Sequence, residues 1–218
     1  ARHPDSVSTF ADQRMLTARN LSYRLPDGRE LFRSVELALQ PGDAVAITGP
    51  SGTGKSTLLW LLGGLVQPTI SAVDISTPNP HPIAWVLQGL YSLSARTVLH
   101  NTMLCGVIDG AKRSSIVNQS QLALHAVGLS EFAATKIRAL SGGELQRVAV
   151  ARALASGRPV ILADEPTNQL DRTNATNVMH LLAEERHKGR VVVIVTHDTA
   201  SLPAGVRQMQ LTPEGLTC

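Results

Sequence analysis

A glycine-rich run could bind the phosphates of a nucleotide. Residues 49–56 read Gly-Pro-Ser-Gly-Thr-Gly-Lys-Ser, the spacing GxxxxGK(S/T) in which backbone N–H groups converge on a phosphate at the start of a helix. The ammonium group of Lys55 can bind the β- and γ-phosphates, and the hydroxyl of Ser56 can coordinate Mg²⁺. The run predicts a nucleoside triphosphate site, although a kinase or a GTPase would fit it equally well. The residues expected to contact the nucleotide here are Gly49, Pro50, Ser51, Gly52, Thr53, Gly54, Lys55, Ser56 and Thr57.

Three further side chains with acid, base or ligand chemistry follow two apolar runs. Asp164 and Glu165 come directly after the apolar residues 160–163, and His197 follows the β-branched residues 191–195. In open α/β sheets, ligands bind at the carboxyl ends of the strands, where these side chains are expected to lie. Successive side chains on a strand point to opposite faces, so the two carboxylates can have different tasks.

Residues 140–147 read Leu-Ser-Gly-Gly-Glu-Leu-Gln-Arg and predict the start of a helix. Ser141 is a suitable N-cap, and Glu144 in the third position after it completes a capping box, so a purely structural role is one interpretation. Two glycines in the first turn, however, destabilise a helix by about 1 kcal/mol each relative to Ala. Their presence is explained if backbone N–H groups must approach a ligand closely. This favours a binding role for Ser141, Gly142 and Gly143.

Here the sequence resembles the ABC ATPase family, over nearly the whole chain from about residue 16 to 211. The resemblance rests on the glycine-rich run, on the acidic strand end, and on the Leu-Ser-Gly-Gly-Glu signature, in which Glu144 replaces the commoner Gln. In that family the signature lies across a head-to-tail dimer and binds the γ-phosphate held by the other subunit. The resemblance therefore implies an ATPase that uses ATP and Mg²⁺ and pairs with itself or with a homologous ATPase domain.

The resemblance also implies roles for single residues. Asp164 is similar to the family's Mg²⁺-associated acid, Glu165 to its general base, and His197 to its switch histidine, which contacts the γ-phosphate. Gln88 matches the glutamine that touches the Mg²⁺ shell, and Tyr23 lies upstream of Lys55 where the family places an aromatic residue that stacks on adenine. Asp171 ends a segment similar to the family's D-loop and can also cap the next helix. The implied catalytic residues are Lys55, Gln88, Glu165 and His197; the metal ligands are Ser56, Gln88 and Asp164; the nucleotide contacts outside the phosphate loop are Tyr23, Ser141, Gly142, Gly143 and Asp171.

Apolar runs that alternate with helical patterns must position these residues. The alternation favours βα units around a largely parallel sheet, and the segment 1–40, with a turn at 26–28, predicts an antiparallel β hairpin region. Residues 112–156 are expected to be mostly helical. The expected strands of the core are 45–48, 83–87, 160–163 and 191–195, and its expected helices are about 55–62 and 171–187.

The expected fold is therefore α/β, a P-loop NTPase core with a largely parallel sheet, an N-terminal antiparallel β region and a helical insertion, as in ABC ATPases. One domain is expected over residues 1–218, with a helical subdomain at about 90–158. Residues 67–82 are shorter than usual for the family and lack its usual strand pattern, which weakens the prediction of the antiparallel region. The chain ends soon after His197, so no C-terminal regulatory domain is expected.

Composition and charge exclude several functions. The chain has 218 residues, 43% hydrophobic and 17% charged, and a mean hydropathy of +0.04, as in soluble globular proteins. Its longest apolar stretch, residues 58–66, is far shorter than the roughly 20 residues of a membrane-spanning helix, so a membrane role requires a partner. The formal charge of +3 comes without a basic stripe, and no direct contact with nucleic acid is expected.

Two functions remain. The first is the motor of an ABC transporter, which lies in the cytoplasm on the inner face of the membrane and drives partner transmembrane subunits. The alternative is a soluble ABC ATPase that acts on nucleic acid or ribosomes. Only residues 56–139 lie between Lys55 and Leu140, which leaves no room for the long insertions of repair and chromosome types, so the transporter is favoured. Whether the transporter imports or exports its cargo stays open. Residues 162–167 resemble the lipoprotein-release and macrolide-export group, whereas residues 95–101 have a pattern common to many transporter motors.

Overall fold

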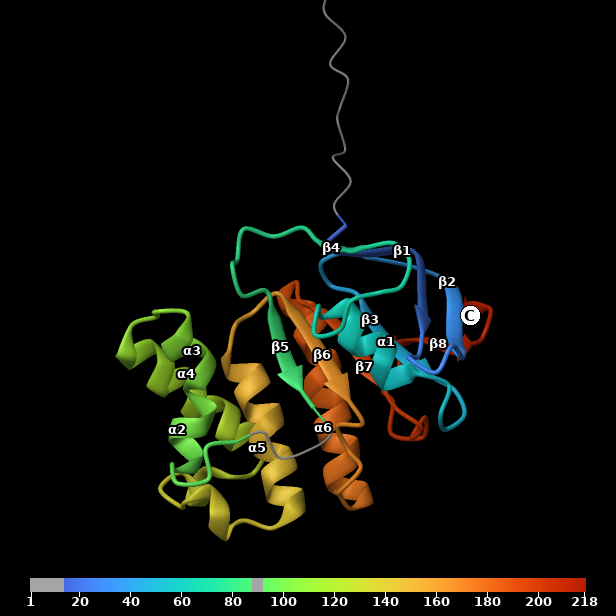
Figure 1. Cartoon of the computed structure of the whole chain (residues 1–218). Helices are drawn as coiled ribbons and strands as arrows, with labels where there is room; N and C mark the ends of the chain where they lie inside the picture. The colour runs from blue at the N-terminus through green and yellow to red at the C-terminus, as the bar shows by residue number, and fades with distance from the viewer. Residues whose placement is uncertain (1–13, 88–91) are drawn as a thin grey trace, which may run out of the picture.

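The computed structural model of the chain describes residues 14–87 and 92–218. These residues form two β-sheets with helices packed against them (Figure 1). None of the helices in these two ranges is both long and apolar enough to cross a membrane.

The smaller sheet is antiparallel and is built from the N-terminal part of the chain. Strand β1 (Leu16–Arg24) pairs with β2 (Glu30–Leu39) on one side and with β4 (Val73–Ile75) on the other. The hairpin expected within the segment 1–40 is therefore present. Strand β4 has the alternating sequence Val-Asp-Ile, but three residues are too few for this pattern to predict a strand. The antiparallel region expected from the sequence is therefore confirmed, and the doubt drawn from residues 67–82 was wrong, because pairing with β1 holds β4 in place.

The larger sheet has six strands in the order β5-β6-β7-β3-β8-β9, and all neighbours are parallel except β8 and β9. Every residue of β6 and β7 is buried. Continuous apolar runs are expected for parallel strands that are covered on both faces. The strands of this sheet are β3 (Ala44–Thr48), β5 (Ile83–Val86), β6 (Val160–Asp164), β7 (Val191–Val195), β8 (Arg207–Thr212) and β9 (Gly215–Thr217).

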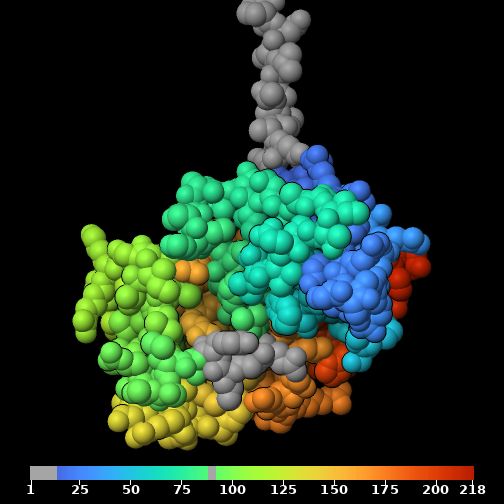
Figure 2. Space-filling model, viewed as in Figure 1, coloured from blue at the N-terminus to red at the C-terminus, as the bar shows by residue number. Residues whose placement is uncertain are grey.

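Helices cover both faces of the larger sheet and also form a lobe beside it. In Figure 2 the residues around 100–140, in green and yellow, lie on one side of the molecule, and the antiparallel sheet, in blue, lies on the other. The α-helices are α1 (Lys55–Leu62), α2 (Val98–Thr102), α3 (Leu104–Ile108), α4 (Arg113–Ala126), α5 (Gly142–Ala155) and α6 (Arg172–Glu184); short 3-10 turns are Ser130–Phe132, Ile137–Ala139 and Glu185–Lys188. The expectation of one domain over residues 1–218 with a helical subdomain at about 90–158 stays a prediction.

The core consists of two apolar layers, one on each face of the larger sheet. Ile161 and Ala163 of β6 point into the layer shared with α2, α4, α5 and α6. Val160 and Leu162 point into the layer shared with α1 and the antiparallel sheet. This alternation follows from the two-residue period of a strand. It fixes the register of the sheet, because a slip by one residue would exchange the two layers. The fixed register therefore brings the carboxyl ends of the neighbouring parallel strands to the same edge of the sheet.

Candidate functional site

The phosphate loop links β3 to α1, as the sequence predicts. Gly49, Gly52 and Gly54 have φ angles of 148°, 80° and 91°, which residues with a Cβ rarely adopt. A Cβ on Gly54 would also lie 3.1 Å from Leu31 Cδ1 and 3.2 Å from Phe32 Cδ1, so the N-terminal hairpin packs directly against the loop. No side chain caps the first turn of α1. Its N–H groups are therefore placed to bind a phosphate.

The Lys55 side chain folds back over this loop. Its Nζ donates hydrogen bonds to the carbonyl oxygens of Gly49, at 2.8 Å, and Pro50, at 2.9 Å. The hydroxyl of Thr53 also donates to the Pro50 carbonyl, at 2.9 Å, and closes the turn. The loop therefore presents one ammonium group beside a set of backbone N–H groups, which is an anion-binding arrangement.

Ser56 and Asp164 meet although they are far apart in the sequence. The Ser56 hydroxyl donates to Asp164 Oδ1 at 2.9 Å. Burial raises the pKa of Asp164, as does the nearby Glu165 charge, while the Ser56 hydrogen bond and the Lys55 charge act in the opposite direction. Because burial disfavours the ionised form of Asp164, a bound cation would stabilise its carboxylate. The Ser56 hydroxyl oxygen and the Asp164 carboxylate oxygen are both ligands that Mg²⁺ accepts.

The donor set fits Mg²⁺ held partly by a nucleotide. Within residues 14–87 and 92–218, no cluster of three or more His, Cys, Asp or Glu side chains could hold a metal ion by itself. Mg²⁺ is commonly bound through one or two protein oxygens together with substrate phosphates and water. Ser56 and Asp164 would hold the ion, and the ion would supply positive charge to the phosphates. The third predicted ligand, Gln88, lies outside the described residues.

Glu165 continues β6 by one residue and then turns toward His197. The ring Nδ1 of His197 lies 2.9 Å from Glu165 Oε2, and the Glu165 N–H still bonds the Val195 carbonyl at 2.9 Å. Glu165 has a φ of +46°, which is unusual for a residue with a Cβ and is typical of strained functional positions. Its side chain is only 12% exposed, whereas that of His197 is 67% exposed. The two carboxylates at the end of β6 thus face different partners.

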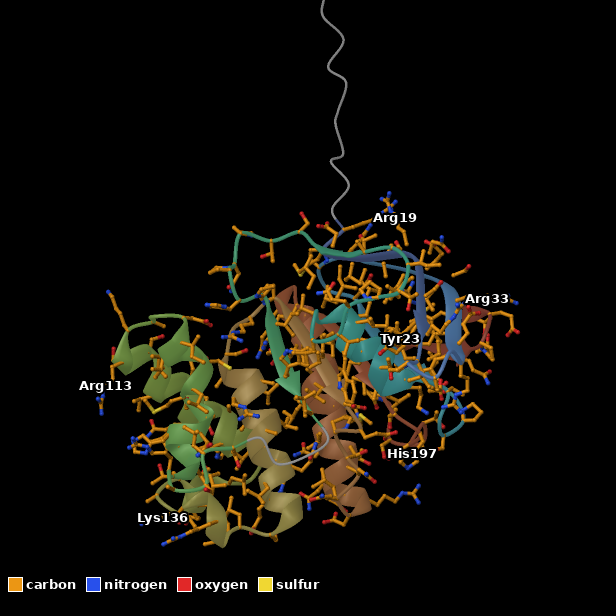
Figure 3. The ribbon with its side chains drawn as sticks, viewed as in Figure 1. Arg19, Tyr23, Arg33, Arg113, Lys136 and His197 are labelled. Carbon is orange, nitrogen blue, oxygen red and sulfur yellow. The ribbon has the colours of Figure 1, made fainter. Side chains whose placement is uncertain are left out.

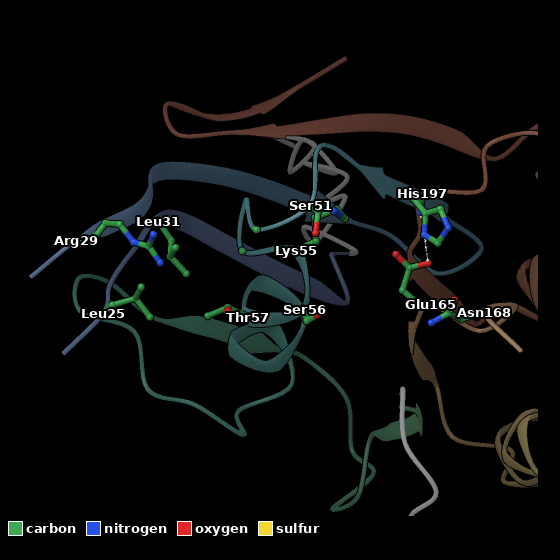
Figure 4. A pocket seen from close by; sticks show the side chains of 12 residues that line it. Leu25, Arg29, Leu31, Ser51, Lys55, Ser56, Thr57, Glu165, Asn168 and His197 are labelled. Atoms are coloured by element: carbon green, nitrogen blue, oxygen red, sulfur yellow. Dashed lines mark hydrogen bonds and ion pairs between the residues drawn. The ribbon is translucent and has the colours of Figure 1, made fainter. Parts of the chain in front are cut away.

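Most of these groups line one elongated cavity of about 480 Å³ (Figure 4), although Asp164 and Gly49 are not among its lining residues. Glu165, Asn168 and His197 form one end, and the phosphate loop with the first turn of α1 forms the middle. The opposite end is lined by Leu25, Arg29 and Leu31. The cavity is lined by Leu25, Arg29, Leu31, Ser51, Gly52, Gly54, Lys55, Ser56, Thr57, Glu165, Asn168 and His197.

Comparison with known proteins identifies the family to which this site belongs. A profile described as "ABC transporter" matches residues 32–168, a range that runs from β2 through the phosphate loop and the signature to Asn168. The chain belongs to the ABC transporter family.

Proteins similar to this ABC chain include named transport components. It is 37% identical over 200 residues to the lipoprotein-releasing system ATP-binding protein LolD 1 of Rhodopirellula baltica, a match that covers 84% of this chain and 87% of that protein. It is 37% identical over 200 residues to the macrolide export ATP-binding/permease protein MacB of Salmonella choleraesuis. This chain spans only 31% of the length of that MacB protein.

The fold is also that of solved ABC cassettes. A dimeric cassette, MJ0796, in a post-hydrolysis state bound to ADP and Pi, has a TM-score of 0.83 and 31% sequence identity, over 94% of this chain and 97% of that one. The α/β core, the antiparallel region and the helices are therefore those of an ABC ATPase, as the sequence predicts. The chain is an ATP-binding and ATP-hydrolysing cassette, and its relatives favour the transporter over the soluble alternative.

The ABC signature lies outside the cavity of its own chain. Ser141, Gly142, Gly143 and Asp171 are absent from the residues that line the cavity. Ser141 caps α5 with a complete capping box, in which its hydroxyl accepts from the Glu144 N–H and the Glu144 carboxylate accepts from the Ser141 N–H. Asp171 caps α6 through its carboxylate, which accepts from the Asn174 N–H at 2.9 Å. The structural interpretation of both motifs therefore holds, and their nucleotide contacts stay predictions.

The two signature glycines have a second reason to lack side chains. A Cβ on Gly142 would overlap Gln169 Oε1, and a Cβ on Gly143 would lie 2.9 Å from the backbone carbonyl oxygen of Gln169. The first turn of α5 therefore packs closely on the segment 166–171, which follows Glu165. The sequence pattern pointed only to a ligand, because a contact between segments far apart in the chain leaves no local pattern.

We expect the two glycines to respond differently to substitution by Ala. Helix propensity predicts a gain of up to about 1 kcal/mol at each position. At Gly142 the flexible Gln169 side chain can move aside, so the stability should change little. At Gly143 the obstacle is backbone, so the free energy of unfolding should fall by about 1–2 kcal/mol. Urea denaturation of the two single variants measures this difference. Equal stabilisation by both would show that the packing against Gln169 is absent in solution.

Tyr23 is not among the residues that line the cavity and Gln88 lies outside the described residues, whereas four residues that the sequence did not predict line the cavity. Tyr23 is half-buried on β1 (Figure 3), opposite Phe32, and packs against the apolar core; it does not line the cavity. Its stacking on adenine stays a prediction, as does the role of Gln88. The unpredicted lining residues are Leu25, Arg29, Leu31 and Asn168. Asn168 could have been found from its position soon after Glu165. The other three lie in or beside a turn whose direction no sequence motif reveals.

Proposed function

We propose that this ABC cassette is the motor of a membrane transporter and that it hydrolyses ATP at sites shared between two cassettes. Each site would combine the cavity of one cassette with the signature turn of the other. The observation that carries this proposal is the separation of the phosphate loop from Ser141 and Gly143 within one chain. A site made in cis would require the signature in the same cavity. The dimeric form of the similar MJ0796 cassette supports a paired arrangement.

The residues of the cavity suggest how hydrolysis proceeds. Lys55 and the N–H groups of the loop would bind the β- and γ-phosphates, and Ser56, Asp164 and Gln88 would hold Mg²⁺. Glu165 would accept a proton from the attacking water, since its carboxylate lies at the cavity end. His197 would orient that carboxylate through the 2.9 Å contact and reach the γ-phosphate. Catalysis would then consist of positioning and charge stabilisation, because phosphoryl transfer needs little covalent chemistry.

The transported cargo would be set by partner membrane subunits or domains. Relatives named for macrolide export and lipoprotein release support this, and one of them combines an ATP-binding part with a permease in one protein. The cassette would sit on the cytoplasmic side of the membrane through that partner. Direct contact with nucleic acid is not part of the proposal.

Mixing two inactive variants tests the shared site. A Lys55→Ala chain lacks the lysine that would bind the β- and γ-phosphates, and a Gly143→Asp chain lacks a functional signature. In a mixed dimer, the intact loop of one chain meets the intact signature of the other, so one of the two sites is complete. The mixture should recover up to about a quarter of the wild-type ATPase rate, because half of randomly formed dimers are mixed and each has one working site.

A second mixture is the matched control. Lys55→Ala mixed with Glu165→Gln should recover nothing, because both changes affect the cavity side and neither mixed site is complete. Recovery in this control, or no recovery in the first mixture, would rule out a site shared in the proposed way.

A further inference from the structure

Three side chains line the end of the cavity where hydrolysis requires the attacking water: Glu165, Asn168 and His197 (Figure 4). A water aligned for in-line attack presents a lone pair to the γ-phosphorus and has two O–H groups to donate. Two acceptors are therefore needed to orient it, and the general base is only one of them.

The Glu165 carboxylate has one oxygen left for this water. Its Oε2 accepts from His197, whose ring Nδ1 lies at 2.9 Å and whose backbone N–H lies at 3.4 Å. Its Oε1 forms no hydrogen bond with any residue in the ranges 14–87 and 92–218. Oε1 can accept one water proton, so the other O–H group needs a second acceptor.

A turn that directly follows β6 holds Asn168 beside Glu165. The Asn168 N–H donates to the Glu165 carbonyl at 3.2 Å, and the Leu170 N–H donates to the Thr167 carbonyl at 3.0 Å. Thr167 is itself buried, so the turn is anchored on the core. Figure 4 shows the Asn168 side chain next to that of Glu165, at the same end of the cavity.

The Asn168 carboxamide is available to a ligand. It is exposed, and it forms no hydrogen bond within the part of the chain that the structure describes. An unbonded carboxamide can turn its oxygen inward, and that oxygen is a neutral acceptor. The ring of His197, the other polar group at this end, is already bound to Glu165. Asn168 is therefore the side chain placed to accept from the second O–H group.

We propose that Asn168 is a catalytic residue that accepts a hydrogen bond from the attacking water, and that it acts in the cavity of its own chain. The water oxygen forms a bond to the γ-phosphorus, the bond from that phosphorus to the bridging oxygen of ADP breaks, and one water proton passes to Glu165. Asn168 keeps its hydrogen bond throughout and exchanges no proton. This inference rests on the proposed hydrolysis at this cavity with Glu165 as the base.

A mixture of two chains tests on which side of the site Asn168 acts. In the mixed dimer of Lys55→Ala and Gly143→Asp, the Gly143→Asp chain supplies the working cavity. Adding Asn168→Ala to that chain should lower the recovered kcat about 3- to 10-fold, the effect of one hydrogen bond, and leave KM for ATP within about twofold. On the Lys55→Ala chain, whose cavity is already inactive, Asn168→Ala should have no such effect.

Asn118→Ala is the matched control, because it makes the same chemical change at an exposed position of α4 outside the cavity. On the Gly143→Asp chain it should leave the recovered kcat unchanged. Urea denaturation should give Asn168→Ala the free energy of unfolding of the wild type, because this carboxamide has no hydrogen bond to lose.

The proposal is overturned if neither placement of Asn168→Ala lowers kcat, if the loss follows the Lys55→Ala chain, or if KM rises as much as kcat falls. If the mixture without Asn168→Ala recovers no activity, the shared site is what fails. The single Asn168→Ala variant of the otherwise unchanged chain then decides, and an unchanged kcat overturns the role of Asn168.

Discussion

Glu165→Gln should reduce the ATPase rate by about 10²- to 10⁴-fold while nucleotide binding persists, the range expected for loss of a general base. The amide is nearly isosteric with the carboxylate, so the contact with His197 at 2.9 Å can be kept. What is lost is the ability to accept a proton from the attacking water. Because Lys55, Ser56 and Asp164 are unchanged, the binding of Mg-ATP should remain close to that of the wild type.

The same variant should accumulate as a dimer in the presence of Mg-ATP. Two cassettes that bind ATP between them and cannot hydrolyse it have no route to open, so size-exclusion chromatography with light scattering should show twice the monomer mass only when Mg-ATP is present. Glu131→Gln makes the same chemical change at an exposed position outside the cavity and should behave like the wild type. Wild-type turnover by Glu165→Gln would remove Glu165 from its proposed role.

Arg190→Met should lower the free energy of unfolding by about 3–5 kcal/mol, because it leaves a buried carboxylate without its main partner. Arg190 and Glu185 are both buried, and Arg190 Nη1 lies 2.6 Å from Glu185 Oε2. Burial lowers the pKa of Arg190, and the adjacent Glu185 charge counteracts this shift. The guanidinium also binds the end of α5 and the segment just before β6; its other acceptors are the Ser156 hydroxyl and the carbonyl oxygens of Ala153, Leu154 and Arg158.

A double variant separates the loss of charge pairing from the loss of packing. Glu185→Leu combined with Arg190→Met removes both buried charges, and it should recover a large part of the lost stability, because apolar replacements of a buried pair are often neutral or stabilising. Arg207→Met, on the exposed side of β8, is the surface control and should change stability by less than about 0.5 kcal/mol. Urea denaturation of the wild type and these three variants provides the comparison. A cost below about 1 kcal/mol for Arg190→Met alone would contradict the proposed role.

Features that depend on neighbouring residues were predictable from the sequence. The apolar runs became β3, β5, β6 and β7, and the phosphate loop lies between a strand and α1 as its spacing requires. The capping box of Ser141 and Glu144 formed as expected. Each of these features rests on hydrogen bonds or side-chain periods that extend over a few residues, so local sequence contains the information. The family, the ATP chemistry and the elements that carry it follow from such local patterns.

Features that join distant segments arise only in the folded chain. The strand β4 exists because β1 pairs with it, and Ser56 meets Asp164 because β3 and β6 end at the same edge of one sheet. The overlap of a Gly142 side chain with Gln169 and the position of Arg29 at the cavity end are of the same kind. Which side chains meet across the elements depends on strand register, on the packing of the two apolar layers and on the direction of turns, and these are set only when the whole core is assembled.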